Sequence, residues 1–193
     1  MPMLFEDSLP AEVSANPKGG EMDLVATHQR LLVCGALQTQ GTILELGVGW
    51  YSTPLLHEIS KAQKRRLITI DNNPYWLNQF RNLQNPYHTF IDIGWWGEMQ
   101  AEDHYGLVFV DNGQPIEREY CIRKLINRAD LFVMHDTEEH FAYGYNRTLP
   151  MFKYAWTDKC QKIWTTIASN VINVEEEFSL IQLPSVEPSQ EVT

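Results

Sequence analysis

The sequence has few cysteines, and they are not grouped. Its three cysteines, Cys34, Cys121 and Cys160, lie far apart and form no CxxC pair. Zinc modules and disulfide scaffolds need grouped cysteines, so the sequence favours neither class. Isolated thiols are typical of a reducing compartment, and we expect a cytoplasmic protein whose cysteines are unpaired.

Long hydrophobic runs and basic stripes are also missing. No stretch of about 18 apolar residues is present, so the sequence predicts no transmembrane helix. The first 20 residues lack a basic segment followed by an apolar one, and we expect no secretory signal there. The formal net charge is -10, and the only basic cluster is KAQKRR at 61–66. This charge argues against nucleic acid or a membrane surface as a partner.

The chain is long enough for one domain with short extensions. It has 193 residues, of which 44% are hydrophobic and 21% charged. Residues 1–20 are rich in Pro, Ser, Gly and acidic residues and predict a flexible arm. Residues 21–184 form the predicted domain, and 185–193 read as a disordered tail. A homodimer is compatible with the sequence, which does not determine the oligomeric state.

Strand-like and helix-like segments alternate along the domain. The strand-like segments are continuous apolar runs, which is typical of parallel strands buried on both faces. Helices are expected at 21–38, from Thr53-Pro54 onward, at 74–84 and at 114–128, and strands at 41–49, 66–74, 87–93, 105–113 and 129–139. The pattern predicts an α/β fold with a doubly wound, mostly parallel sheet. Two further strand-like runs, 159–169 and 176–184, have no helix between them and predict an antiparallel hairpin at one edge.

Acidic residues recur where the predicted parallel strands end. Ligands of such sheets bind outside the carboxyl ends of the strands, so these residues are site candidates. They are Glu45, Asp71, Asp92, Asp111 and Asp136.

The first strand runs into the loop ILELGVGWYST at 43–53. A dinucleotide fingerprint needs a third glycine, but Ser52 stands in that place. Trp50 and Tyr51 would crowd a pyrophosphate, and Glu45 would repel it. A carboxylate there suits a cationic, phosphate-free ligand such as S-adenosylmethionine (SAM). Asp71, at the end of the second strand, could accept the two ribose hydroxyls.

Four segments carry a resemblance to a known family. The segments ILELGVGWYST, LITIDNN, FIDI and LVFVDNG resemble motifs I to IV of class I SAM-dependent methyltransferases. The resemblance covers roughly residues 21–183. It implies that Glu45, Gly47 and Gly49 line the methionine and ribose and that Asp71 binds the ribose hydroxyls. It also implies that Asn72, Asp92 and Ile93 meet the adenine, and that Asp111 faces the methionyl amine or the acceptor.

The segments VFVDNG and VMHDTEEH resemble the metal-dependent O-methyltransferases within that family. In that subgroup, Asp residues ending the fourth and fifth strands and a following Asn bind a divalent cation. Asp111 and Asp136 match, but Thr137 stands in place of the Asn. Glu138, Glu139, His135 or His140 could complete the set, which would suit Mg²⁺ or Mn²⁺. The predicted metal ligands are Asp111, Asp136 and Glu138.

These observations predict an enzyme that transfers a methyl group from SAM to a small-molecule acceptor, most simply at a hydroxyl oxygen. The candidate catalytic residues are Asp111, His135 and Asp136; without a metal, His135 or His140 could act as general base. Three alternatives stay open: an NAD(P)-type Rossmann enzyme, a metal-dependent tailoring enzyme of another reaction on the same fold, and a non-catalytic SAM-binding protein. Trp95 and Trp96, after the third strand, form either an adenine or acceptor cover or a core-plus-surface pair.

Overall fold

The described part of the chain, residues 26–113 and 115–179 of the computed structural model, alternates helices and strands. The arm expected at 1–20 and the tail expected at 185–193 lie outside these residues. The elements are α1 (Gln29–Gln38), β1 (Ile43–Leu46), α2 (Thr53–Gln63), β2 (Leu67–Asp71), α3 (Pro74–Asn78), η2 (Arg81–Leu83), β3 (His88–Asp92), η3 (Trp96–Glu98), β4 (Tyr105–Val110), α4 (Pro115–Leu125), β5 (Ala129–His135), α5 (Tyr145–Thr148), η4 (Leu149–Met151), β6 (Tyr154–Asp158), β7 (Thr165–Ser169) and α6 (Val174–Ser179).

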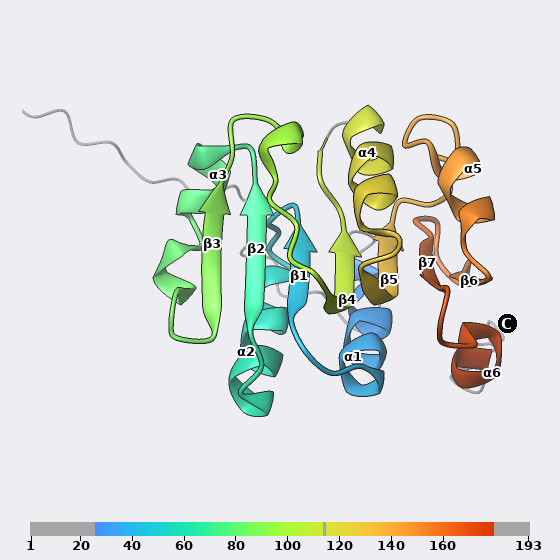
Figure 1. Cartoon of the computed structure of the whole chain (residues 1–193), viewed down its shortest axis with the longest axis horizontal. Coiled ribbons are helices and arrows are strands. Elements are labelled where there is room, and N and C mark those ends of the chain that lie inside the picture. Colours follow the sequence, from blue (N-terminus) through green and yellow to red (C-terminus); the bar gives the residue numbers. More distant parts are fainter. Residues whose placement is uncertain (1–25, 114, 180–193) are drawn as a thin grey trace, which may run out of the picture.

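The seven strands form one sheet in the order β3-β2-β1-β4-β5-β7-β6. Strands β1 to β5 pair in parallel, whereas β7 runs antiparallel to both β5 and β6. Figure 1 shows the five parallel strands pointing the same way. The predicted doubly wound α/β fold with an antiparallel edge is therefore confirmed. The strand order reverses between β1 and β4, and a crevice at such a switch point is where this fold class binds ligands.

Apolar side chains on both faces of the sheet explain the continuous hydrophobic runs. Successive residues of β1 point to opposite faces. Leu44 and Leu46 join a buried cluster with Ile122 of α4, whereas Ile43 joins another with Leu31 of α1. Helices thus cover both faces of the central strands, and polar side chains are left to gather at the strand ends.

The edge hairpin exists, but one of its strands is not the one predicted. Strand β7 falls within the expected 159–169, and its partner is β6 at Tyr154–Asp158. The expected second strand at 176–184 is wrong in its described part, because α6 spans Val174–Ser179. Val174 and Phe178, four residues apart, are both fully buried, and this spacing suits a helix face rather than a strand. Residues 180–184 lie outside the described residues.

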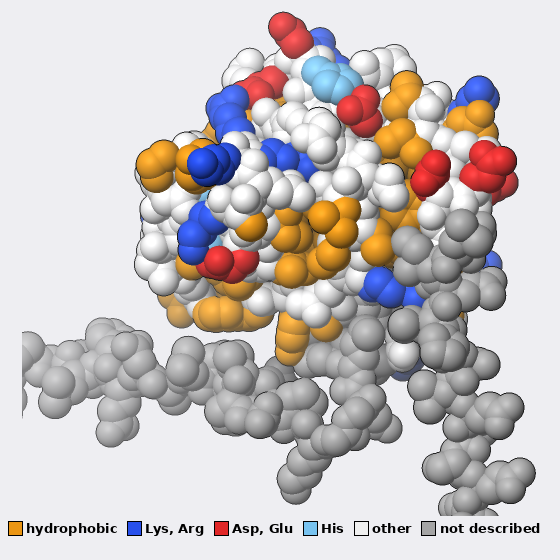
Figure 2. Space-filling model, turned by 90° about the horizontal axis from the view of Figure 1, so that it is seen from below, with side chains coloured by type: hydrophobic (Ala, Val, Ile, Leu, Met, Phe, Trp, Pro, Cys, Tyr) orange, Lys and Arg blue, Asp and Glu red, His pale blue; other side chains and the backbone are white. Residues whose placement is uncertain are grey.

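The face at the amino ends of the parallel strands carries charges of both signs. In the part of this face that Figure 2 leaves uncovered, Lys and Arg are scattered with Asp and Glu, and hydrophobic side chains lie between them. None of the helices in the described ranges is both long and apolar enough to cross a membrane.

Candidate functional site

The loop after β1 lies against the loop after β4, and Gly47 makes this approach possible. Gly47 has φ +91°, and a β-carbon there would lie 2.5 Å from the backbone oxygen of Asp111. Both the left-handed backbone and the close contact require glycine. Gly49 has neither constraint, since a β-carbon there would meet the Ser52 hydroxyl at 3.3 Å.

The backbone N–H groups of this loop are used inside the protein. Gly47 N donates to Ile70 O, and Val48 N donates to Asp71 Oδ2 at 2.8 Å. Gly49 N donates to Thr53 Oγ1 at 2.9 Å. A phosphate-binding glycine loop instead presents free N–H groups to its ligand. The loop is therefore not arranged as an anion cradle.

A pocket of about 270 Å³ opens beside this loop. Two carboxylates face it and no Lys, Arg or His does, so it favours a cation with hydroxyl groups over an anion. Its lining residues are Gly47, Val48, Asp71, Asn72, Asn73, Trp76, Asp111 and Gly113. The pocket thus brings together four of the predicted site residues, Gly47, Asp71, Asn72 and Asp111.

Asp71 and Trp76 both line the pocket and bond to the backbone of the glycine loop. Besides Val48 N, the Asp71 carboxylate accepts from Asn73 N at 2.7 Å. Burial raises the pKa of Asp71, and these backbone N–H groups oppose the rise. The Trp76 indole donates to Val48 O at 2.6 Å and ties the glycine loop to α3. Each Asp71 oxygen keeps acceptor capacity for a ligand hydroxyl.

Glu45 lies beneath the loop and is fully buried. Its Oε1 accepts from Thr53 Oγ1 at 3.0 Å and its Oε2 from Thr69 Oγ1 at 2.6 Å. The chain continues from Thr69 Oγ1 to His88 Nε2 at 2.8 Å, and from His88 Nδ1 to His57 Nδ1 at 3.1 Å. Burial raises the pKa of Glu45 to about 7, against the opposing effect of these hydrogen bonds. Glu45 contacts the pocket through the loop and not directly.

A charged cluster joins the ends of β4 and β5. His135 Nδ1 lies 3.4 Å from Asp111 Oδ1 and 3.5 Å from Asp136 Oδ1. Arg118 of α4 contacts the same two carboxylates at 3.0 Å each. Asp136 has φ +55°, a left-handed conformation in which Asp is enriched, and this turn follows β5 directly. All three predicted catalytic residues, Asp111, His135 and Asp136, therefore meet at one place.

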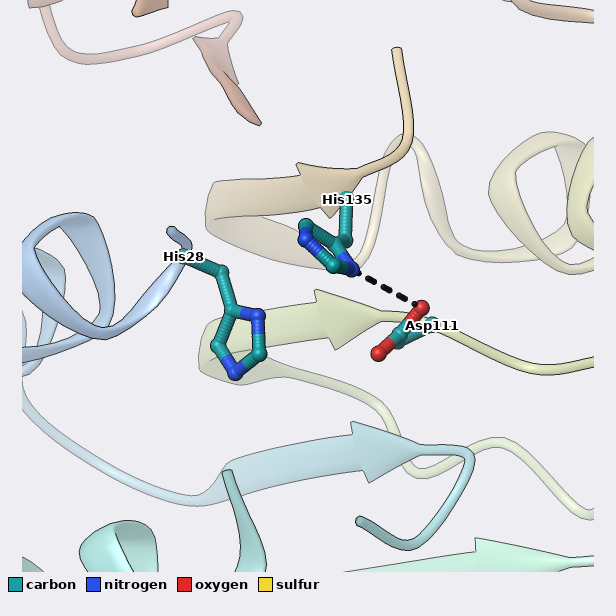
Figure 3. Close-up of side chains that lie close together, drawn as sticks. All are labelled: His28, Asp111 and His135. Atoms are coloured by element: carbon teal, nitrogen blue, oxygen red, sulfur yellow. Dashed lines mark hydrogen bonds and ion pairs between the residues drawn. The ribbon is translucent and has the colours of Figure 1, made fainter. Parts of the chain in front are cut away.

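His28, just before α1, completes a second grouping with Asp111 and His135 (Figure 3). Within the described ranges these three form the one set of at least three potential ligands whose donor atoms lie within 4.8 Å of one another. His28 is buried, and within the described residues its ring nitrogens make no hydrogen bond of good geometry, although the nearby Tyr51 backbone favours its charged form. Burial and the neighbouring His135 lower the pKa of His28 to about 4.

The pKa values of the other two members, His135 and Asp111, are both shifted in the direction that favours the charged form. Burial disfavours the charge on His135, but the hydrogen bond and charge of Asp111 outweigh it and raise the pKa of His135. Burial likewise opposes ionisation of Asp111, and His135 and Arg118 more than offset it, so the pKa of Asp111 lies below its usual value. Asp111 therefore presents a negative charge to the pocket.

The predicted third metal ligand is engaged elsewhere. Glu138 Oε2 accepts from the backbone N–H of Trp164 at 2.7 Å. Thr137 is buried and its hydroxyl accepts from Thr166 Oγ1 at 2.8 Å. The structure thus brings Asp111 and Asp136 together, and it places Glu138 against the edge of β7.

The remaining predicted residues do not line the pocket. Asp92 pairs in register with Asp71, and Ile93 is buried in the core. Trp95 is 61% exposed and Trp96 1% exposed, so the tryptophans form the core-plus-surface pair. His140 stacks edge-on against Trp164, with ring centroids 6.2 Å apart.

Arg118 and His28 are the site residues that the strand-end pattern misses. Both belong to helices or their starts, where strand-end reasoning does not look. Arg118 stands near the beginning of α4, where the helix dipole disfavours a positive charge. A basic residue in that position signals a specific acidic partner, and Asp111 lies seven residues earlier.

Solved structures share this architecture. A candidate O-methyltransferase from Klebsiella pneumoniae is 16% identical, with a TM-score of 0.57 over 81% of this chain and 84% of that chain. Cofactor-bound Rv0187 from MTB is 18% identical, with a TM-score of 0.57 over the same shares. An O-methyltransferase from Bacillus cereus in complex with SAH is 14% identical, with a TM-score of 0.55 over 81% and 86%.

Sequence comparison adds no relative, since no protein-family model and no curated protein matches the chain. The order of the strands, the reversed β7 and these structural neighbours agree with one another. The fold of the chain is that of the class I SAM-dependent methyltransferases.

Proposed function

We propose that this protein transfers a methyl group from SAM to a small-molecule acceptor, at a hydroxyl oxygen. The observation that carries the proposal is the chemistry of the pocket beside the glycine loop. Its N–H groups are satisfied internally, and its ligand-facing charges are the carboxylates of Asp71 and Asp111. SAM offers an ammonium, a sulfonium and two ribose hydroxyls, and it carries no phosphate.

The cofactor would lie across the switch point of the sheet. Asp71 accepts hydrogen bonds from the ribose hydroxyls, and Asp111 pairs with the ammonium. Gly47 and Gly49 allow the loop backbone to approach the cofactor. Glu45 supports that loop from below through Thr53. Asn72, which lines the pocket, would meet the adenine, with Asp92 beside Asp71 in the sheet and Ile93 packed behind them in the core. The lowered pKa of Asp111 suits this role, because an ionised carboxylate binds an ammonium best.

The acceptor would lie on the Asp136 side of the cluster. The acceptor oxygen attacks the methyl carbon, the bond from that carbon to sulfur breaks, and the neutral thioether leaves. Asp136, which is partly exposed, takes the hydroxyl proton, and His135 behind it stabilises the carboxylate pair. The protein contributes mainly alignment and acceptor deprotonation.

The NAD(P)-type alternative is disfavoured by the same pocket. A pyrophosphate would meet Asp71 and Asp111 without a facing cation, and the loop offers it no free N–H at 47–49. A small-molecule acceptor is favoured over nucleic acid by the net charge of -10.

Calorimetry with SAM, S-adenosylhomocysteine and NADH tests the cofactor. We expect the first two to bind and NADH not to bind. Asp71→Ala should raise the dissociation constant of SAM at least tenfold. The variant loses two hydrogen bonds to an ionised acceptor, each of which contributes about 1.5–3 kcal/mol. Asp103→Ala, an exposed carboxylate far from the pocket lining, is the matched control.

Two results would count against the proposal. Absence of SAM binding at millimolar concentration would exclude the cofactor. SAM binding without formation of S-adenosylhomocysteine, over a broad panel of hydroxylated acceptors, would instead favour the non-catalytic alternative.

A further inference from the structure

The feature that the predicted chemistry does not account for is the guanidinium of Arg118. Its side chain is 3% exposed and lies between the ends of β4 and β5. One nitrogen, Nη2, donates to Asp111 Oδ1 and to Asp136 Oδ2, each at 3.0 Å. These two carboxylates are the pair that matches the cation-binding Asp residues of the metal-dependent O-methyltransferases.

Every N–H group of this guanidinium has an acceptor. Nε donates to Asn112 O at 2.6 Å, and Nη1 donates to His135 O at 2.8 Å and to Tyr145 Oη at 3.2 Å. With the two bonds from Nη2, these use all five donors of an arginine. The guanidinium also stacks against Tyr143, and Cζ of Arg118 lies 3.9 Å from the centroid of the Tyr143 ring. Arg118 therefore has no N–H left for a ligand, and it acts through the groups that it holds.

A divalent cation between Asp111 and Asp136 does not fit this arrangement. The cation would compete with Arg118 for both carboxylates and would lie beside its positive charge. The predicted third ligand is also engaged elsewhere, because Glu138 accepts from Trp164 N just before β7, and Thr137 in the Asn position bonds to Thr166 of β7. A buried, fully bonded arginine is also costly to displace, since its N–H groups would lose their partners.

We propose that Arg118 takes the place of the divalent cation between Asp111 and Asp136, so that the site works without Mg²⁺ or Mn²⁺ there. The guanidinium fixes the positions of the two carboxylates, one of which follows β4 and the other β5. It offsets one of their two negative charges and bonds only Oδ1 of Asp111 and Oδ2 of Asp136, so the second oxygen of each carboxylate is not bonded to Arg118 and can meet an ammonium or a hydroxyl proton. Arg118 is thus a positioning residue of the proposed methyl transfer, on which this inference rests.

Metal binding tests the inference separately from methyl transfer. Manganese would be titrated into the full chain and followed by the electron paramagnetic resonance signal of free Mn²⁺. Wild type should not bind Mn²⁺ below millimolar concentration. Arg118→Met, which removes the charge and keeps much of the volume, should bind it at least tenfold more tightly. Asp136→Asn in the Arg118→Met background should remove that gain.

Arg123→Met is the matched control, since Arg123 lies on the same helix and pairs with Glu119 at the surface. It should behave as wild type does. Failure of folded Arg118→Met to gain Mn²⁺ binding would overturn the inference. So would wild-type binding that Asp136→Asn abolishes. Wild-type binding that His28→Ala abolishes would overturn it too, because Asp111 would then serve an ion held by His28 and His135.

A second measurement needs no Arg118 variant and stays decisive if Arg118→Met does not fold. The dissociation constant of SAM would be measured for wild type with Mg²⁺ and with EDTA. We expect the two values to agree within twofold. A tenfold tightening by Mg²⁺ that disappears in Asp136→Asn would overturn the inference, whereas absence of any SAM binding would refute the proposed function instead.

Discussion

Glu45 offers a test in which the free energy of unfolding reports a single buried carboxyl. Folding moves the pKa of Glu45 from 4.5 to about 7, chiefly because burial disfavours the charged form. The folded state then binds the proton more tightly than the unfolded chain does. The contribution of Glu45 to the free energy of unfolding is therefore full below pH 4.5. It falls as the pH rises from 4.5 to about 7, and it is lost above that pH. At 1.36 kcal/mol per pKa unit, the loss amounts to about 3 kcal/mol.

Glu45→Gln removes this titration and keeps the shape of the side chain. We expect the difference in unfolding free energy, variant minus wild type, to rise by about 3 kcal/mol between pH 4 and pH 8. Urea unfolding followed by tryptophan fluorescence at half-unit pH steps would measure it. Subtracting wild type cancels the other titrating groups, such as His28 and Asp71, which both variants share.

Glu175→Gln, at an exposed position of α6, is the control and should give a flat difference. The reasoning would be refuted if the Glu45→Gln difference stayed constant within about 0.5 kcal/mol over this range. Such a result would mean that the loop opens enough for water to reach Glu45, and that burial does not govern its charge.

Three further substitutions test the geometry of the site. Gly47→Ala places a β-carbon 2.5 Å from Asp111 O at a φ of +91°, so we expect a loss of more than about 3 kcal/mol of stability or a failure to fold, whereas Gly49→Ala, whose β-carbon meets only the Ser52 hydroxyl, should cost less than about 1 kcal/mol. Equal losses in urea unfolding of the two variants would contradict the close approach of the β1 and β4 loops. Tyr145→Phe removes the hydroxyl that donates to His135 O and accepts from Arg118, and we expect it to cost about 1–3 kcal/mol in thermal unfolding. A neutral result would show that water replaces that hydroxyl.

The strand ends were predictable because buried parallel strands leave a clear trace in a sequence. Apolar runs such as LVFV must be followed by a turn at the sheet edge, so Asp71, Asp111 and Asp136 could be placed at one edge before any coordinates. Their side-chain partners could not. Sequence alone does not say that Val48 N would bond Asp71, or that Glu45 would turn under the loop toward Thr69.

The two principal differences have physical causes. All residues of β6 are half-buried. Their sequence therefore lacks the alternation of buried and exposed positions that would have marked a strand. Arg118 reaches the strand ends from a helix, and the pairing depends on how α4 packs over β4 and β5. Sequence reasoning identified the two carboxylates, but it did not identify Arg118 as their partner.

The buried hydrogen bonds from Glu45 through Thr69 and His88 to His57 have a direction. When Glu45 is ionised, Thr69 donates to it, the Nε2–H of His88 donates to Thr69, and His57 donates to His88. A proton on the Glu45 oxygen that faces Thr69 reverses every one of these donors, because each group has one hydrogen to place between two neighbours. The imidazole tautomers of His88 in β3 and His57 in α2 therefore depend on whether the carboxyl under the glycine loop is charged.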